Sequence, residues 1–142
     1  MRALTIRQPW AGAITHLDKR VENRSWKLPA KHHGARILIH AAATTYAALG
    51  RIHILNLTGD EPENQWPDDR GAIIAAATLT GCHWSSDDGT CCGPWGFENA
   101  YHWTLTDVIA LPEPVPAKGA LGFWTPSPDA LAAVTPQTKE TA

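Results

Sequence analysis

K-R-V-E-N-R-S-W, residues 19–26, is the stretch that best indicates the fold and the chemistry of this chain. It has the composition of a short strand, and successive side chains of a strand point to opposite faces, so Glu22, Arg24 and Trp26 share one face. Stacking of a nucleobase on an aromatic side chain contributes about 1–3 kcal/mol, and a carboxylate accepts a hydrogen bond from an exocyclic amine such as that of cytosine. A structural ion pair with the tryptophans in the core explains the same residues, and residue types alone favour it.

Short strands and two helices are predicted along the rest of the sequence. Ala3–Arg7 alternates polar and apolar residues and predicts a strand, and Pro9–Leu17 predicts a helix because its apolar residues recur at helical spacing. Further strands are predicted at Val21–Trp26, Arg36–Ala41, Gly71–Thr80, Ala100–Leu111 and Leu121–Trp124, with a second helix at Ala42–Leu55. The strands follow one another too closely for a doubly wound sheet, so the pattern predicts a small α+β or barrel-like domain.

The composition is that of one globular domain. Of the 142 residues, 44% are hydrophobic and 18% are charged, which excludes the disordered and collagen-like classes. We expect the domain to span residues 1–126, with residues 127–142 as a flexible tail because they offer little to bury. The prolines Pro112, Pro114 and Pro116 are expected to end regular structure.

Cysteine number and hydropathy bear on the cellular compartment. No apolar run reaches the roughly 18 residues of a membrane helix, and the N-terminal residues lack the pattern of a secretory signal. The three cysteines, Cys82, Cys91 and Cys92, are an odd number, which argues against a complete set of disulfides. We therefore expect a cytoplasmic protein with no membrane partner.

The region between Cys82 and His102 also contains potential zinc ligands. Cys82 is followed by His83, and Cys91 by Cys92. Structural zinc sites usually show paired short spacings such as C-x₂-C, and this chain has none. We therefore predict no metal and no cofactor, with the thiols reduced at the base of a loop.

Charge is distributed unevenly along the chain. Residues 1–40 carry eight Lys and Arg against two carboxylates, a net charge of +6, whereas residues 41–142 carry a net charge of −8. This asymmetry indicates a side that faces a polyanion, unless the two halves interleave on the surface. Because the whole chain has a net charge of −2, affinity for nucleic acid would depend on a local patch.

Six motifs, in this order, resemble the ASCH domain, a branch of the PUA-like superfamily, over residues 3–125 or so. They are R-Q-P-W-A at 7–11, K-R-V-E-N-R-S-W at 19–26, G-A-R-I-L-I-H-A at 34–41, R-G-A-I-I at 70–74, Y-H-W-T-L at 101–105 and P-V-P-A-K-G-A-L-G-F-W at 114–124. They are most similar to the branch that includes the ASCH domain of activating signal cointegrator 1. The resemblance implies a small β-barrel flanked by helices, with a cleft beside the first helix.

Matching the motifs residue by residue implies which side chains line that cleft. They are Gln8, Pro9, Trp10, Lys19, Glu22, Arg24 and Trp26, with His40 and Gly71 as neighbours. Relatives are thought to bind RNA or DNA, in some branches through a modified or flipped base. Extracting a base costs a few kcal/mol unless the strand is already single, so single-stranded RNA or DNA, or a modified base, is the expected ligand.

The leading hypothesis gives each cleft residue a role in binding nucleic acid. Arg7, Lys19 and Arg24 would contact phosphates or base edges. Trp10 and Trp26 would stack on a base or shape the pocket, and Glu22 would accept a hydrogen bond from an amine. A protein-interaction adaptor that uses the fold without any nucleotide is a further hypothesis.

An enzymatic hypothesis comes from a less similar bacterial ASCH branch, which hydrolyses the acetyl amide of acetylated cytidine. That branch uses a Lys, a Thr three residues later and a more distant Glu. Here Lys19 matches the Lys, Glu22 occupies the Thr position, and Glu98 lies in the region of the other Glu. The chemistry would need a deprotonated Lys19, through desolvation or a neighbouring cation. The sequence leaves open whether the protein is an enzyme.

Overall fold

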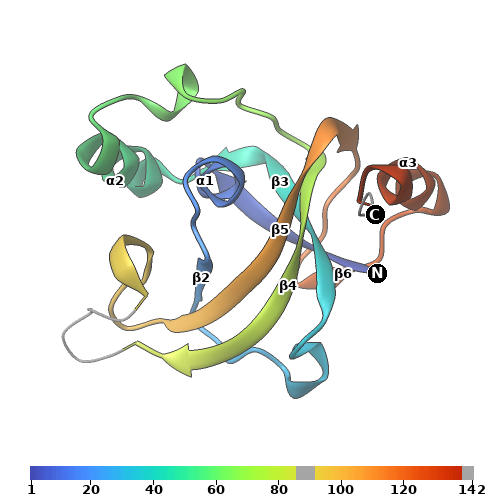
Figure 1. Ribbon diagram of the computed structural model, residues 1–142, viewed down its shortest axis with the longest axis horizontal. Coiled ribbons are helices and arrows are strands. Elements are labelled where there is room, and N and C mark those ends of the chain that lie inside the picture. The colour runs from blue at the N-terminus through green and yellow to red at the C-terminus, as the bar shows by residue number, and fades with distance from the viewer. Residues whose placement is uncertain (86–91, 139–142) are drawn as a thin grey trace.

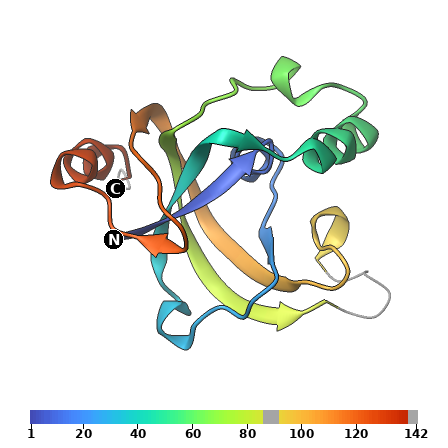
Figure 2. The same ribbon diagram turned by 180° about the vertical axis from the view of Figure 1, so that it is seen from behind.

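Six strands form one curved, mixed sheet within residues 1–85 and 92–138, the part of the chain that the computed structural model describes (Figure 1). The strands are β1 (Arg2–Gln8), β2 (Val21–Arg24), β3 (Arg36–Tyr46), β4 (Ala72–Trp84), β5 (Tyr101–Pro116) and β6 (Phe123–Trp124). Their order in the sheet is β2-β5-β4-β3-β1-β6. β1 and β3 are parallel, and the other neighbouring pairs are antiparallel. The sheet curls into a half-barrel, which Figure 2 shows from behind.

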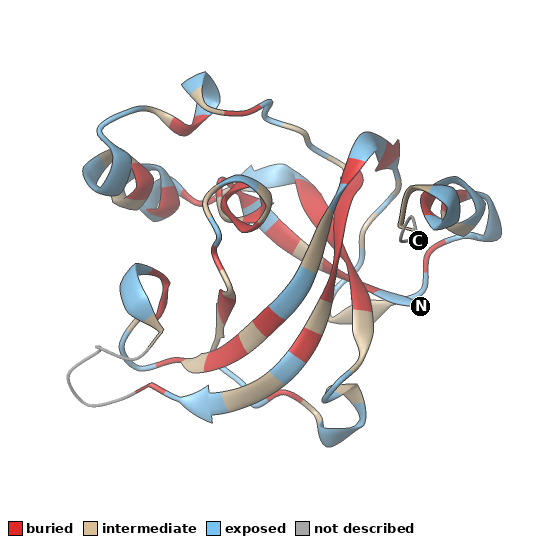
Figure 3. Cartoon of the chain, viewed as in Figure 1, coloured by how far each residue is buried: buried red, intermediate tan, exposed pale blue. Residues whose placement is uncertain are grey.

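Helices cover both sides of this half-barrel, which confirms the predicted α+β class. They are α1 (Trp10–His16), α2 (Ala48–Thr58) and α3 (Pro128–Thr138), with 3₁₀ turns η1 (Ala30–His32), η2 (Pro62–Asn64) and η3 (Gly93–Trp95). α1 lies on the concave side, and Figure 3 shows that much of this helix is buried. Its buried Ala11 and Ile14 pack into one core cluster with Leu4 and Ile39. Among the described helices, none is long and apolar enough to cross a membrane.

A side chain joins the edge strand β2 to β1. The backbone ladder of β2 runs along β5 only, and that of β1 runs along β3 and β6. The Arg24 guanidinium of β2 donates a hydrogen bond through Nη2 to the backbone oxygen of Thr5 in β1, at 3.2 Å. The residue that the sequence assigns to a binding cleft therefore also links the two sides of the half-barrel.

The second predicted helix begins later than expected. β3 continues through the alanine-rich segment to Tyr46, which pairs with Gln8 of β1. The Ala47 amide then donates to the Gln8 backbone oxygen at 2.8 Å, and α2 begins at Ala48. The predicted helix start at Ala42 is wrong because pairing with a neighbouring strand outweighs the helical propensity of alanine.

The prolines in β5 do not end the strand. In the ladder between β4 and β5, Ala110 pairs with Ala75 and Val115 pairs with Ile73. The two positions on β5 are therefore farther apart in sequence than their two partners on β4. The extra residues, 111–114, therefore form a bulge. A bulge removes residues from the hydrogen-bonded ladder, so two of the three prolines are accommodated without loss of a ladder bond.

The segment after residue 126 forms α3, so the expectation that it offers little to bury is wrong for residues 128–138. Ala130 and Val134, four residues apart, are buried in a cluster with Leu111 of β5. The Ala130 amide donates to Ser127 Oγ at 3.1 Å, which caps the first turn. Serine followed by proline at the first helical position is a helix-start signal that the sequence analysis missed.

Candidate functional site

A buried ion cluster lies at the junction of α1 and β2. The Lys19 side chain is 1% exposed. Its ammonium group donates to the backbone oxygen of Val21 and to Glu22 Oε1, the latter at 3.3 Å. The ring of Trp10 lies against it, with its centroid 5.5 Å from Nζ. Backbone, carboxylate and aromatic groups thus replace the water that surrounds an ordinary lysine.

Glu22 lies between two cations. Its Oε1 accepts from Lys19, and its Oε2 accepts from Arg24 Nε at 3.0 Å, with Arg24 Nη2 at 2.9 Å. The Arg24 guanidinium carbon lies 5.6 Å from the ring centroid of Trp103. A buried charge is tolerated when it is paired and hydrogen-bonded, and here each charge meets both conditions. Lys19, Glu22 and Arg24 are called the Lys19 cluster below.

Burial changes the acid–base chemistry of Lys19. Desolvation lowers the pKa of its ammonium group, Glu22 opposes this by charge and hydrogen bonding, and Arg24 adds a small lowering effect. Desolvation outweighs the ion pair, so the pKa lies below the ordinary lysine value. The proton on Lys19 is therefore more easily lost than that of a surface lysine.

Beside the cluster, an aromatic and basic surface reaches solvent. The Trp26 ring is 39% exposed and meets the buried Trp103 edge-to-face, with centroids 4.6 Å apart. The Phe123 ring stacks on the Trp103 ring, with centroids 5.7 Å apart. The His32 ring lies over Phe123, with centroids 3.9 Å apart. We call the partly or fully exposed members of this group the Trp26 surface: Arg2, Arg24, Trp26, Lys31, His32 and Phe123.

The local field at this surface is positive. The pKa of His32 is lowered first by desolvation and then by the charges of Lys31 and Arg2. A histidine whose protonation is opposed by neighbouring cations marks a place where a polyanion would be attracted. The sequence analysis found Arg24 and Trp26 but missed His32 and Phe123, because only the fold brings them to the same place.

Gln8 and Pro9 lie apart from the Lys19 cluster and have structural contacts of their own. The Gln8 side chain is 1% exposed. Its Nε2 donates to the Asp69 backbone oxygen, and its Oε1 accepts from the Gly12 amide, both at 2.9 Å. The Gln8–Pro9 peptide is cis. Gln8 thus ties the loop before β4 to the first turn of α1.

His40 lies on the convex side of the sheet, within a neutral hydrogen-bond network. Its Nε2 donates to the Ala117 backbone oxygen at 2.7 Å, and its Nδ1 accepts from Thr5 Oγ1 at 3.1 Å. The Trp124 indole in turn donates to Thr5 Oγ1 at 3.0 Å. Desolvation lowers the pKa of His40, although the bond to Ala117 opposes this, so the neutral ring is favoured.

Three other predicted residues are not joined to the Lys19 cluster. Gly71 has a φ of 62° at the entry to β4, and its amide donates to the Ala41 backbone oxygen at 2.9 Å, which is a turn role. Arg7 and Glu98 are exposed. Within residues 1–85 and 92–138, neither side chain makes a hydrogen bond or ion pair with Lys19, Glu22 or Arg24.

A pocket of about 240 Å³ opens next to Gln8 and Pro9 rather than at the Lys19 cluster. Its other lining residues are Tyr46, Arg51, Pro62, Glu63, Trp66, Asp68 and Arg70. The two arginines are offset by the two carboxylates, and the Arg70 guanidinium already covers the Tyr46 ring at 5.0 Å. A second pocket, of about 260 Å³, shares Gln8 and Trp66. Neither is lined by Lys19, Glu22 or Arg24, and the balanced charges make the first a poor phosphate site.

Two of the three cysteines lie in the part of this region that the structure describes. Cys82 is a free thiol, and Cys91 lies outside the described residues. Cys82 accepts a hydrogen bond from the Leu28 amide at 3.5 Å. Cys92, however, lies with His83 and His102, and the potential metal-binding atoms of these three residues are within 4.8 Å of one another.

Comparison with protein families agrees with the half-barrel and the motif order. The family model of the ASCH domain matches residues 4–115, and the chain therefore belongs to the ASCH domain family. This confirms the resemblance and the PUA-like fold that it implies. A search of curated proteins found no match. Similarity to the branch of activating signal cointegrator 1 stays a prediction.

Proposed function

We propose that the protein binds single-stranded nucleic acid through the Trp26 surface. The family is consistent with a role in nucleic-acid binding. The observation that carries the proposal is the exposed Trp26 ring, held edge-on by Trp103 beside the Arg24 guanidinium. A base can stack on an exposed indole in any sequence context, while nearby cations contact the phosphates.

The surrounding charges fit a polyanion better than those of the pocket beside Gln8. Lys31 and Arg2 act on His32 with the same sign, whereas Arg51 in the pocket is already held by Glu61 at 2.7 Å. Because the whole chain is slightly acidic, binding would rest on this local patch, and its affinity would fall as salt rises.

In this proposal Lys19 positions other groups and does not contact phosphate. Its ammonium group is sequestered by Val21, Glu22 and the Trp10 ring. Lys19 holds Glu22, and Glu22 in turn orients the Arg24 guanidinium toward the Trp103 face. Glu22 oxygens have further lone pairs, so an amine of a bound base has an acceptor at the edge of the cluster.

Fluorescence anisotropy of a labelled single-stranded RNA, and of the matching DNA, tests the proposal at two salt concentrations. Trp26→Ala removes the stacking ring, and the expected loss is about 1–3 kcal/mol, or roughly 5- to 150-fold in Kd. Leu49→Ala is the control, because Leu49 is 78% exposed on α2, a helix that carries none of the residues of the Trp26 surface.

The two variants separate the possible outcomes. The proposal requires that Leu49→Ala bind as the wild type does and that log Kd depend on log salt with a slope near 0.7 for each phosphate contacted. Equal binding by wild type and Trp26→Ala would contradict the assignment of the surface. Absence of binding to either polymer up to high micromolar concentration would contradict the function and would favour a protein partner.

Hydrolysis of the acetyl amide of cytidine is a second candidate, which the lowered pKa of Lys19 favours. A neutral amine beside Glu22 would accept a proton from an attacking water, and hydrolysis would release acetate and cytidine. Glu98 is exposed and makes no ion pair or hydrogen bond to Lys19 among the described residues. It is therefore assigned no role here.

Release of cytidine from acetylated cytidine, followed by chromatography, measures this activity. Lys19→Met keeps the volume of the buried chain and removes the amine, so turnover should disappear while the far-UV circular dichroism is retained. Turnover that persists in Lys19→Met, or a wild type with no turnover, would exclude Lys19 catalysis.

A further inference from the structure

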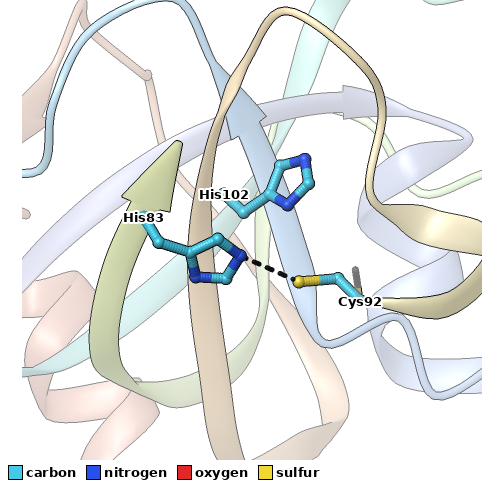
Figure 4. A group of neighbouring side chains, drawn as sticks. All are labelled: His83, Cys92 and His102. Carbon is cyan, nitrogen blue, oxygen red and sulfur yellow. Dashed lines mark hydrogen bonds between the residues drawn. The ribbon is translucent and has the colours of Figure 1, made fainter. Parts of the chain in front are cut away.

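We propose that His83, Cys92 and His102 form a zinc-binding site. Figure 4 shows the three side chains converging, with the Cys92 sulfur directed toward the His83 ring. Cys92 Sγ lies 3.3 Å from His83 Nε2, and the ligand atoms of all three residues lie within 4.8 Å of one another. Tetrahedral zinc with bonds of about 2.0–2.3 Å separates its ligand atoms by about 3.3–3.8 Å. A separation of 4.8 Å would need to contract by about 1.0–1.5 Å to reach these values.

Strand pairing holds two of these ligands in place. His83 of β4 and His102 of β5 are direct partners across the antiparallel ladder, so their side chains lie on the same face. Their ring centroids are 5.1 Å apart. The preceding pair, Cys82 and Trp103, points to the opposite face and into the core. The register of this ladder therefore separates the ligand pair from the neighbouring cysteine.

The orientation of His102 is the one that a zinc ligand needs. Its ring is fully buried, and Nε2 lies 2.7 Å from the Phe97 backbone oxygen. A carbonyl oxygen only accepts, so Nε2 carries the proton and Nδ1 carries the lone pair that can bind a metal. Metal-binding histidines usually donate their other N–H to a carbonyl or carboxylate in this way.

The carbonyl that orients His102 is itself held in place. The Phe97 amide donates to Asn23 Oδ1 at 2.9 Å, and Asn23 Nδ2 donates to the Trp95 backbone oxygen at 2.8 Å. Asn23 pairs directly with His102 across β2 and β5. The support around the ligands is thus built from two strands and the turn that contains η3.

The donor set indicates zinc. One thiolate and two imidazoles suit Zn²⁺, and the residues that the structure describes supply three of the four ligands of a tetrahedral site. On binding, the Cys92 thiol releases its proton to solvent and the sulfur binds the metal as thiolate, while each histidine binds through the lone pair of a ring nitrogen. Zinc affinity should therefore fall as the pH is lowered.

The proposed zinc site is also linked to the Lys19 cluster through aromatic contacts. Phe97, whose carbonyl orients His102, meets the Trp10 ring edge-on at 5.5 Å, and Trp10 covers the Lys19 ammonium group. Bound zinc would tie the turn carrying Cys92 to β4 and β5. The proposal does not depend on nucleic-acid binding, and the experiment below measures metal alone.

Cobalt and zinc titrations of the metal-free full chain test the proposal. Co²⁺ should bind one equivalent and give a thiolate-to-cobalt charge-transfer band with the d–d bands of a tetrahedral site, and Zn²⁺ should displace it. Both His83→Ala and Cys92→Ser should weaken binding by more than about 100-fold, beyond the effect of losing a supporting hydrogen bond. Cys82→Ser is the matched control and should bind as the wild type does.

A further variant keeps the test valid if Cys92→Ser folds poorly. Cys92 has a φ of 67°, which glycine adopts without strain. Cys92→Gly should therefore fold, and it should lack the increase in Tm that zinc gives the wild type. A lack of Co²⁺ binding by the wild type, a spectrum without thiolate charge transfer, or binding unchanged in Cys92→Gly would overturn the proposal.

Discussion

The Lys19 cluster on the concave side of the sheet and the His40 network on the convex side are both buried polar groups, but only the first carries charge. In the Lys19 cluster a carboxylate is shared by two cations, and Arg24 continues to the exposed Trp26 surface. The His40 network is neutral and closed, and a Cβ on Gly119 would lie only 2.7 Å from His40 Cε1. The family motifs therefore include residues of the charged cluster, such as Lys19, and of the neutral network, such as His40. Access to solvent distinguishes a binding role from a structural one.

The largest effect is expected when the charged cluster loses its anion. Glu22→Gln leaves Lys19 and Arg24 without their counter-charge, so the free energy of unfolding should fall by about 3–5 kcal/mol. Urea denaturation measures the loss. Glu61→Gln is the matched control, because it removes the exposed pair with Arg51, and an exposed ion pair contributes little to stability. Equal costs in the two variants would show that the Lys19 cluster is solvated.

Loss of the neutral network should affect stability alone. His40→Ala removes the partners of Thr5 Oγ1 and the Ala117 backbone oxygen and leaves a cavity, for an expected cost of about 2–4 kcal/mol. Because the network lies on the opposite side of the sheet from Trp26, the Kd for single-stranded RNA should stay unchanged below the melting temperature. A higher Kd in folded His40→Ala would contradict the assignment of binding to the concave side and of a purely structural role to the convex side.

Acid should destabilise the protein through His40. Its pKa is lowered in the folded state, so between that value and the unfolded value of about 6.5 the unfolded chain binds more protons. The free energy of unfolding should therefore fall as the pH drops below about 6.5, by at most about 1.4 kcal/mol per pH unit for this one proton. His40→Gln, which does not titrate, should show a smaller slope, whereas an identical slope would assign the effect elsewhere.

The smallest effect concerns the helix that covers the convex side. Ser127→Ala removes the cap that accepts from the Ala130 amide, and the expected cost is about 1 kcal/mol. Thermal unfolding measures it, with Thr135→Ala as a control, because the Thr135 hydroxyl donates within the helix to the Leu131 backbone oxygen. A cost near zero would mean that α3 contributes little to the stability of the convex layer.

The sequence predicts the fold class well because the strand signals are strong and local. Alternation predicts β1, and motif order predicts the ASCH domain, which the family match confirms. The boundaries at Ala42 and Pro112 are wrong because pairing of β3 with β1 and a bulge in β5 decide them. Such contacts between distant residues leave no local pattern in a single sequence.

The candidate site was predictable only in part, for the same reason. The strand spacing correctly brings Glu22 and Arg24 together, and the motif adds Lys19. Phe123 and His32 are distant in sequence and meet Trp103 only after folding. The grouping of His83, Cys92 and His102 matches no short sequence spacing typical of metal sites. The two histidines come together because they are paired in the register of β4 and β5.

The central claim, that nucleic acid binds at the Trp26 surface, is tested most directly by the indole N–H signals of the seven tryptophans in a ¹H–¹⁵N NMR titration with a short single-stranded RNA. The account predicts the largest shifts at Trp26 and at Trp103, on which it packs. Trp66 should hardly move, since it lines the pocket beside Gln8. Shifts confined to Trp66, or none at saturating RNA, would contradict it.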